Sequence, residues 1–340
     1  MEDGDMARPR VYVTRIIPQA GLDMVRELCE AEVWQGETPP PREVLLDKVK
    51  GVQGLLSLLT DPIDATVMDT AGPQLRVIAN YAVGYDNVDV AAATERGILV
   101  TNTPGVLTET TADFSFALLL AAARRVVEGM DYIRAGKWRS WGPVLLLGHD
   151  VHRATLGIIG LGRIGSGMAR RAQGFDMRVL TYDPHCSEDS GKALGAQCVD
   201  LDTLLAESDF VSVHVPLTPE THYMLGAEQF KKMKPSAILI NTARGPIVDP
   251  GALYDALEHG DIAYAALDVT EPEPLPADHK LLALSNVIIC PHMASASVAT
   301  RTKMAAMAAE NLIAALEGEI PPNLVNPEAL NRRTARKGRF

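Results

Sequence analysis

Short apolar runs alternate with amphipathic segments of helix length along almost the whole chain. In the first 105 residues the apolar runs of strand length are Val11–Thr14, Gly54–Leu59, Val77–Ala82 and Ile98–Thr101. The segments between them, at about 20–29, 42–50, 65–71 and 90–95, have the spacing of helices. Such alternation is typical of βαβ units, in which consecutive strands are parallel and the crossovers are right-handed.

The same pattern begins again near residue 155. The apolar runs of this second half that we predict as strands are Thr155–Ile159, Arg178–Tyr182, Phe210–Val215, Ala237–Asn241, Tyr264–Asp268 and Val287–Cys290. A single hydrophobic core stops growing at roughly 250–300 residues. A chain of 340 residues with two such stretches therefore predicts two α/β domains with parallel sheets.

A glycine-rich turn lies between the first strand of the second half and the helix predicted at about 166–173. Residues 155–167 read TLGIIGLGRIGSG, which places Gly160, Gly162 and Gly165 in the spacing GxGxxG. The first glycine allows a tight turn, the second lets backbone approach a pyrophosphate, and the third lets helix and strand pack closely. Asp183 follows the next strand, near the expected spacing of about 20 residues, where a carboxylate accepts ribose hydroxyls and repels the extra phosphate of NADP. We therefore predict a dinucleotide site with NAD as the cofactor.

Composition narrows the classes of partner. Hydrophobic residues make up 47% and charged residues 22% of the chain, which is ordinary for a soluble globular protein. The net charge of −11 argues against nucleic acid or an anionic membrane as a partner. The longest apolar stretch, Phe114–Ala123, has half the length of a membrane span, and the acidic start MEDGDMARPR differs from a signal peptide. The four cysteines have no metal-ligand spacing and are too few for a disulfide framework. We expect reduced cysteines, no metal and a cytoplasmic location.

Three side chains suited to chemistry follow predicted strands in the second half. They are Arg244 in INTARG, Glu273 in LDVTEPEP and His292 in CPHMAS. An arginine can hold a carboxylate through two parallel hydrogen bonds and polarise a neighbouring carbonyl. A histidine can pass the proton that accompanies a hydride, and a carboxylate beside it favours the charged imidazole. The three residues therefore indicate redox chemistry between a carbonyl and an alcohol.

At these residues the chain resembles the D-isomer-specific 2-hydroxyacid dehydrogenases, most closely their glyoxylate/hydroxypyruvate reductase branch. The resemblance runs from Val11 to about Ala329. The motifs that carry it are NYAVGYDN (80–87), TPGVLTETTAD (103–113), GIIGLGRIG (157–165), VPLTPET (215–221), NTARG (241–245), LDVTEPEPLP (267–276) and PHMASAS (291–297). It implies an NAD-dependent enzyme that reduces glyoxylate or hydroxypyruvate, which are 2-keto acids, to D-2-hydroxy acids.

The resemblance also implies roles for individual residues. Arg244 would orient the substrate, His292 would be the general acid and base, and Glu273 would be its partner. Backbone N–H groups of Val83 and Gly84 would meet the substrate carboxylate. The cofactor contacts that the resemblance implies are Gly160, Gly162, Arg163, Ile164, Gly165, Asp183, Val215, Pro216, Thr221, Thr242, Ala243, Asp268 and Ser295.

The family's architecture implies two Rossmann-like domains with the substrate in the cleft between them. A discontinuous substrate domain would comprise residues 8–105 and 296–330, with a long helix at about 296–317, and residues 106–295 would form the NAD-binding domain. Residues 111–148 would be an arm that joins two subunits into a homodimer. Trp141 on this arm would either reach the partner's substrate or anchor its own arm. We expect residues 331–340 to be a solvated tail.

Some alternatives stay open. Glu271 competes with Glu273 as the partner of the histidine, and His214 fits a wall of the cofactor pocket better than a proton carrier. Ala294 stands where the family commonly has glycine, as in HIGS, and its methyl group could affect nicotinamide packing or rate.

Other functions are compatible with the same motifs. One is a related dehydrogenase of phosphoglycerate, D-lactate, formate or phosphite. Another is an NAD-sensing corepressor with the same fold and the same Arg–Glu–His set. The compact chain argues against phosphoglycerate enzymes that carry an extra regulatory domain. It also argues against a corepressor with long disordered extensions.

Overall fold

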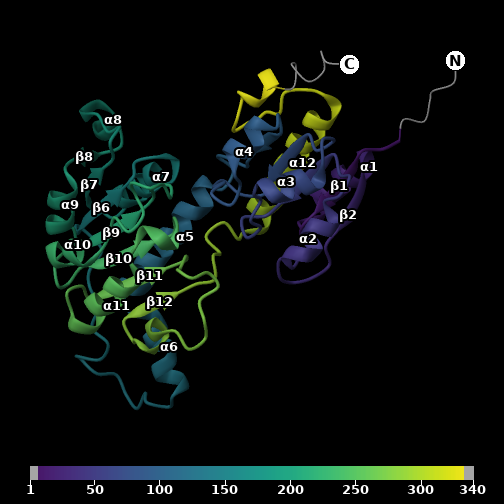
Figure 1. Ribbon diagram of the computed structural model, residues 1–340. Coiled ribbons are helices and arrows are strands. Elements are labelled where there is room, and N and C mark those ends of the chain that lie inside the picture. The colour runs from purple at the N-terminus through teal and green to yellow at the C-terminus, as the bar shows by residue number, and fades with distance from the viewer. Residues whose placement is uncertain (1–6, 333–340) are drawn as a thin grey trace. The chain divides into compact units, whose positions relative to one another are not determined.

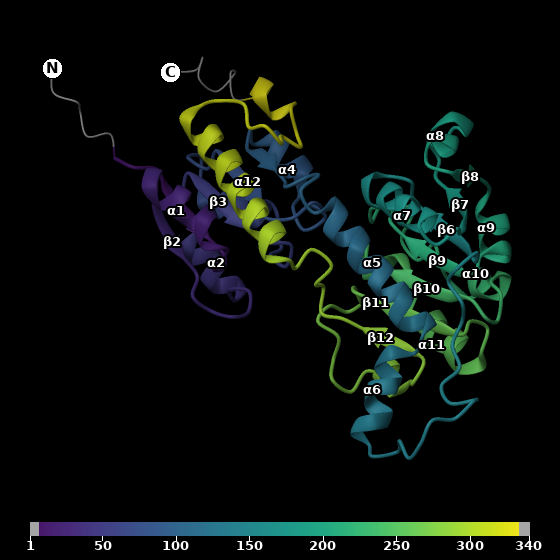
Figure 2. The same cartoon turned by 180° about the vertical axis from the view of Figure 1, so that it is seen from behind.

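The chain forms two α/β units. The computed structural model describes residues 7–332. Its backbone divides at 107/108 and 296/297 into a first unit, taken from both ends of the chain, and a second unit, Thr108–Ala296. The expected domain boundaries lie at 105/106 and 295/296. Figures 1 and 2 show each unit as one sheet with helices on both faces, which confirms the predicted fold class.

The first unit is a five-stranded parallel sheet in the order β2-β1-β3-β4-β5. Its strands are β1 (Arg10–Val13), β2 (Glu30–Val33), β3 (Gly54–Ser57), β4 (Val77–Asn80) and β5 (Leu99–Thr101). Its helices are α1 (Gln19–Leu28), α2 (Arg42–Lys48), α3 (Ala65–Ala71), α4 (Val90–Glu95) and α12 (Val298–Glu317). Helices α1 and α12 cover one face and α2, α3 and α4 the other, so that the neighbours Val77 and Ile78 of β4 enter different cores.

The second unit is a seven-stranded parallel sheet in the order β12-β11-β10-β9-β6-β7-β8. Its strands are β6 (Thr155–Ile159), β7 (Arg178–Tyr182), β8 (Ala196–Cys198), β9 (Phe210–Val213), β10 (Ile238–Asn241), β11 (Tyr264–Leu267) and β12 (Val287–Ile289). Its helices are α5 (Thr108–Ala123), α6 (Val126–Arg134), α7 (Arg163–Gln173), α8 (Glu188–Ala193), α9 (Leu201–Glu207), α10 (Ala227–Lys232) and α11 (Pro250–His259), with short 3₁₀ turns at Gly245–Ile247 and Lys280–Ala283. The strand order reverses between β6 and β9, and ligands of such sheets bind beyond the carboxyl ends of the strands at this point.

Burial explains why the inner strands could be predicted. Residues of β3, β4, β9, β10 and β11 are buried throughout, because helices cover both sides of the sheet, and such strands are continuous apolar runs in the sequence. The edge strands β2 and β8 were not predicted. Glu30–Val33 alternates exposed and half-buried residues, and Ala196–Cys198 is too short to give a pattern.

The expectation of reduced cysteines is wrong for one pair. Cys186, in the loop after β7, forms a disulfide with Cys198, at the end of β8. The pairing of β7 with β8 sets Thr181 opposite Cys198, so the loop that leaves β7 passes beside the end of β8. Sequence spacing does not show this pairing. Cys29 and Cys290 are free thiols.

Two further points concern the whole chain. Among the helices of residues 7–332, none combines the length and the apolar content that a membrane span requires. Of the predicted tail, Asn331 and Arg332 are helical, and residues 333–340 lie outside the described residues.

Candidate active site

The glycine turn connects β6 to α7 and has one open position. Gly160 has a φ of +94°, and a Cβ there would lie 2.8 Å from Cγ1 of Val215. A Cβ on Gly165 would lie 2.0 Å from the carbonyl oxygen of Gly160, so the helix packs directly on the turn. A Cβ on Gly162 would meet nothing within 4 Å. The turn is thus packed tightly against the protein at Gly160 and Gly165. It is open at Gly162, beside the N-terminus of α7, where backbone N–H groups favour a phosphate.

Asp183 lies beside this turn. Ile159 pairs with Tyr182 in the parallel register of β6 and β7, so the residues after the two strands are neighbours. The Asp183 carboxylate accepts hydrogen bonds from the backbone N–H groups of Leu161 and His185, both at 2.8 Å. These bonds fix the carboxylate beside the turn and leave lone pairs on both oxygens for hydroxyl donors.

His292 and Glu273 form a pair. Nδ1 of His292 lies 2.6 Å from Oε1 of Glu273, and Oε2 of Glu273 accepts a bond from the N–H of Thr270 at 3.3 Å. Burial raises the pKa of Glu273, but the hydrogen bond to His292 and the charges of His292 and Arg244 outweigh it and lower that pKa below its usual value. His292 has a φ of +52°, a conformation that few residues other than glycine adopt and that is concentrated at functional sites.

Asp268 holds the histidine turn in place. Its side chain is 1% exposed, and its two oxygens accept the N–H groups of Met293 and Ala294, each at 2.7 Å. Its backbone carbonyl accepts the N–H of His292 at 2.9 Å. Burial raises the pKa of Asp268 despite these bonds. Ala294 makes its bond through the backbone, so the methyl group that replaces the family's hydrogen leaves this contact intact.

Arg244 follows β10 in a turn that Asn241 shapes. The Asn241 amide donates to the carbonyl of Arg244 at 2.9 Å and accepts from the N–H of Ala243 at 3.0 Å. A Cβ on Gly245 would lie 2.0 Å from the carbonyl oxygen of Thr270, so this turn packs against the loop after β11. That packing brings Arg244 close enough to Glu273 to lower its pKa. We did not predict Asn241 as a site residue, although an asparagine after a strand and before a glycine turn is a known signal of local backbone bonding.

The remaining predicted cofactor residues line the same carboxyl edge of the sheet. Thr242, 7% exposed, shares a hydrogen bond of 2.7 Å with Ser115 of α5. Thr221 donates to the carbonyl of Pro216 at 2.7 Å and so closes the loop after β9. Arg163 and Ile164 form the first turn of α7. The other members of the set, Val215, Ala243 and Ser295, are half-buried.

The competing residues have other surroundings. Desolvation lowers the pKa of His214 to about 3, and Nε2 of its ring lies 2.8 Å from Oγ of Ser212. His214 is therefore neutral, and its place in the wall of a cofactor pocket stays a prediction. Glu271 raises the pKa of Tyr223 through a hydrogen bond, and no hydrogen bond between Glu271 and His292 occurs in the described chain.

The first unit presents a turn with two open donors. Val83 and Gly84 follow β4 and are half-buried. Their carbonyls accept side-chain amides of Asn102 and Asn80, at 2.8 and 2.9 Å. Within residues 7–332 neither backbone N–H donates a hydrogen bond. These two groups are therefore available to an anion.

The first part of the predicted arm, residues 111–123, belongs to α5, whose Ala112, Phe116 and Leu119 are buried in the core. We therefore use the name arm for residues 124–148. Helix α6, within the arm, has no buried residue. Trp141 is 80% exposed.

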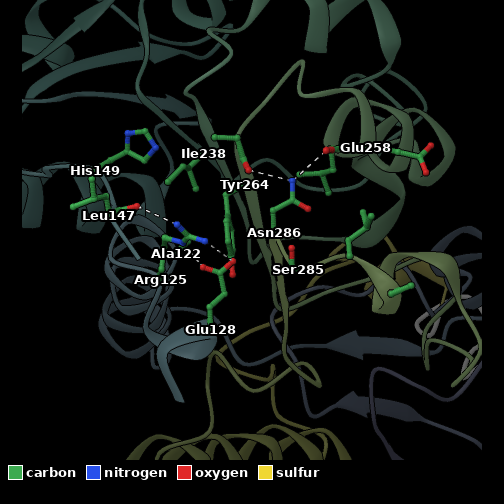
Figure 3. Close-up of a pocket in the computed structure, with 14 residues that line it drawn as sticks. Ala122, Arg125, Glu128, Leu147, His149, Ile238, Glu258, Tyr264, Ser285 and Asn286 are labelled. Atoms are coloured by element: carbon green, nitrogen blue, oxygen red, sulfur yellow. Dashed lines mark hydrogen bonds and ion pairs between the residues drawn. The ribbon is translucent and has the colours of Figure 1, made fainter. Parts of the chain in front are cut away.

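A pocket of about 530 Å³ lies at the base of the arm (Figure 3). Arg125 and Glu128 form an ion pair on one side of it, and Tyr264 and Asn286 line another side. Tyr264 begins β11 and Asn286 precedes β12, so the pocket is at the amino edge of the sheet. The pocket and the His292–Glu273 pair are therefore at opposite edges.

Comparison with known proteins is independent of this geometry. Residues 116–294 match the model of the D-isomer specific 2-hydroxyacid dehydrogenase NAD binding domain. The glyoxylate reductase of Korarchaeum cryptofilum is 59% identical over 327 residues, which are 96% of this chain and 98% of that protein.

Solved structures agree. The TT0316 protein of Thermus thermophilus has a TM-score of 0.88 at 52% identity and covers 93% of this chain and 99% of its own. The NADPH-dependent glyoxylate/hydroxypyruvate reductase of Sinorhizobium meliloti, in complex with NADP and malonate, has a TM-score of 0.81 at 33% identity, with 95% and 98% covered. The chain therefore belongs to the D-isomer-specific 2-hydroxyacid dehydrogenase family of NAD(P)-dependent oxidoreductases.

Proposed function

We propose that this protein reduces glyoxylate, and also hydroxypyruvate, to the corresponding 2-hydroxy acids, in the D configuration where the product is chiral, with NADH as the hydride donor. The observation that carries the proposal is the 2.6 Å contact of His292 with Glu273, in a cluster that also holds Arg244. In this cluster His292 is a proton donor and Arg244 can bind a carboxylate, and the reduction of a 2-keto acid requires both. The likeness to the Korarchaeum glyoxylate reductase favours this substrate class over phosphoglycerate, D-lactate and phosphite.

The second unit fits a nicotinamide dinucleotide. Open space at Gly162 and the N-terminus of α7 suit the pyrophosphate, and the Asp183 carboxylate beside them suits the ribose hydroxyls. Thr242 and Asp268, at the carboxyl edge of the same sheet, would lie beside the nicotinamide. When bound, the cofactor supplies the hydride.

The chain's own residues orient the substrate and move the proton. Arg244 binds the substrate carboxylate and carbonyl through two N–H donors of its guanidinium. In the first unit, the N–H groups of Val83 and Gly84 form a pair of donors suited to a carboxylate. Because Nδ1 of His292 is bonded to Glu273, Nε2 is the nitrogen that donates a proton to the keto oxygen. Glu273 remains ionised, since its pKa is lowered, and stabilises the imidazolium.

Asp183 favours NADH over NADPH. In NADPH a phosphate replaces one ribose hydroxyl, so two negative groups would face each other. No lysine or arginine lies between Asp183 and Lys192, while Glu188 and Asp189 add negative charge. A relative with 33% identity is described as NADPH-dependent, so the fold itself accepts either cofactor. The preference therefore rests on this loop.

Two copies of the chain form the active protein in our proposal. Of the large apolar side chains that are exposed in residues 7–332, half lie between Val126 and Leu147, on the arm. Concentration of this kind marks an interaction surface, and a second arm of the same composition would bury it. In such a dimer Trp141 lies at the partner's substrate.

A panel of 2-keto acids tested with NADH and with NADPH tests the function. We expect turnover of glyoxylate and hydroxypyruvate, with NADH preferred by about tenfold or more, because a charge-assisted hydrogen bond is lost and a repulsion gained with NADPH. The double variant Asp183→Ser/Pro184→Arg should erode or reverse the preference. Tight NADH binding without turnover of any keto acid would favour a corepressor-like protein. Equal use of NADH and NADPH by the wild type would contradict the proposed contact between Asp183 and the ribose.

A further inference from the structure

The turn Ala82–Gly84 is held on its carbonyl side by groups from elsewhere in the first unit. The carbonyl of Ala82 accepts the N–H of Thr103 at 2.8 Å. The carbonyl of Val83 accepts Nδ2 of Asn102 at 2.8 Å, and that of Gly84 accepts Nδ2 of Asn80 at 2.9 Å. The three consecutive carbonyls are thus all bonded, and the N–H groups of Val83 and Gly84 are left as donors.

Asn102 is itself anchored to the C-terminal part of the chain. Helix α12 packs against β4 and β5 in the first unit. Its Asn311, 0% exposed, donates to the carbonyl of Asn102 at 3.0 Å. The same amide accepts the N–H and Nδ2 of Asn323, at 3.1 and 3.2 Å. The N–H of Asn102 donates to the carbonyl of Asn323 at 3.3 Å. Asn102 therefore has little freedom to leave Val83.

Asn80 is anchored inside the sheet edge. It is 1% exposed, and its Oδ1 accepts the hydroxyl of Ser57 at 3.1 Å. Its Nδ2 also reaches Oδ1 of Asn87 at 3.1 Å, and Asn87 binds the carbonyls of Leu58 and Asp61 at 3.0 Å each. The amide that holds Gly84 is thus part of a buried network rather than a mobile surface group.

We propose that Asn102 and Asn80 are positioning residues that hold the Val83–Gly84 turn with its two N–H groups turned outward as a carboxylate-binding pair. The inference deepens the proposed function, on which it rests, and it concerns residues of the first unit only. Preorganised donors bind an anion without a further ordering cost, whereas a turn free to rotate would first lose entropy or present a carbonyl oxygen. We call the two asparagine–carbonyl contacts that hold this turn the clamp. Without the clamp, carboxylate binding weakens while the dinucleotide site is unaffected.

The test uses the full-length protein and oxalate, a dicarboxylate with no keto group to reduce. Oxalate binding is titrated by calorimetry with NADH present, and glyoxylate turnover is measured in parallel. Asn102→Ala removes the amide that fixes Val83. We expect the dissociation constant of oxalate and the KM for glyoxylate to rise about tenfold, with the KM for NADH within twofold of the wild-type value.

Asn326→Ala is the matched control. Asn326 is 2% exposed and lies in the same unit, but its amide binds Val100, Thr94 and Ile98 instead of the turn. We expect this variant to lower the melting temperature while oxalate binding stays within twofold. The clamp is overturned if oxalate does not bind the wild type, or if Asn102→Ala lowers the melting temperature without weakening oxalate. A wild type that binds oxalate but does not turn over glyoxylate contradicts the proposed function alone.

Discussion

At the scale of residues, two glutamates in one loop have different surroundings. Glu273 is bonded to His292, and this hydrogen bond and the charge of His292 lower the pKa of Glu273. Glu271 faces Tyr223 instead. Both glutamates precede a proline in the order Glu-Pro-Glu-Pro, so residue type and the following residue do not distinguish them. What distinguishes them is the path of their loop, which brings Glu273 to His292 in the turn after β12.

This difference predicts a pH effect. In the reductive direction His292 must donate a proton, so the rate of reduction falls at high pH. Glu273→Gln removes the negative charge that favours the protonated ring, so this fall should move to lower pH. The pH profile of kcat/KM for glyoxylate measures it. Glu271→Gln is the control and should keep the wild-type profile; an unchanged profile in Glu273→Gln would remove this residue as the partner.

At the scale of elements, the loop between β7 and β8 carries both the Asp183 carboxylate and the Cys186–Cys198 disulfide. The disulfide closes a segment that includes the six-residue helix α8. The N–H of Cys186 donates to the carbonyl of Asp183, so the crosslinked segment is joined directly to the residue that carries this carboxylate. Glu188, Asp189 and Lys192 of α8 are exposed, and a short exposed segment depends on a crosslink more than a core strand does.

We expect removal of this disulfide to loosen the ribose side of the cofactor site. Cys198→Ser should raise the KM for NADH several-fold and lower the melting temperature by several degrees, because closing so short a loop is worth about 2–3 kcal/mol. A reductant should do the same to the wild type, as followed by thermal unfolding and NADH kinetics. It should leave the variant unchanged, and a reductant effect of equal size on the variant would assign the change to another group.

At the scale of the whole molecule, the second unit keeps an apolar surface that its own core does not use. Val126, Met130 and Ile133 of α6 are 52%, 47% and 56% exposed. A homodimer through the arm would remove them from water.

Ile133→Glu should therefore weaken the dimer. A carboxylate buried without a partner in the interface costs several kcal/mol, so the dimer dissociation constant should rise about 100-fold or more. Sedimentation over a range of concentrations measures it. Val298→Glu, at an apolar site that is 89% exposed on the first unit, is the control and should leave the dimer intact. A wild type that is monomeric at all concentrations would contradict the arm as a subunit interface.

The sequence by itself determined the fold class, the buried strands, the glycine turn and the three residues Arg244, Glu273 and His292 as candidates. These depend on local properties: apolar periodicity, backbone freedom at glycine, and the type of residue that follows a strand. The tertiary structure decided which side chains meet. Edge strands β2 and β8, the Cys186–Cys198 bond and the asparagines behind Val83 and Gly84 follow from strand pairing and helix packing between distant segments. Contacts of this kind leave no period in the sequence, because each is made by two residues whose separation along the chain is set by everything folded between them.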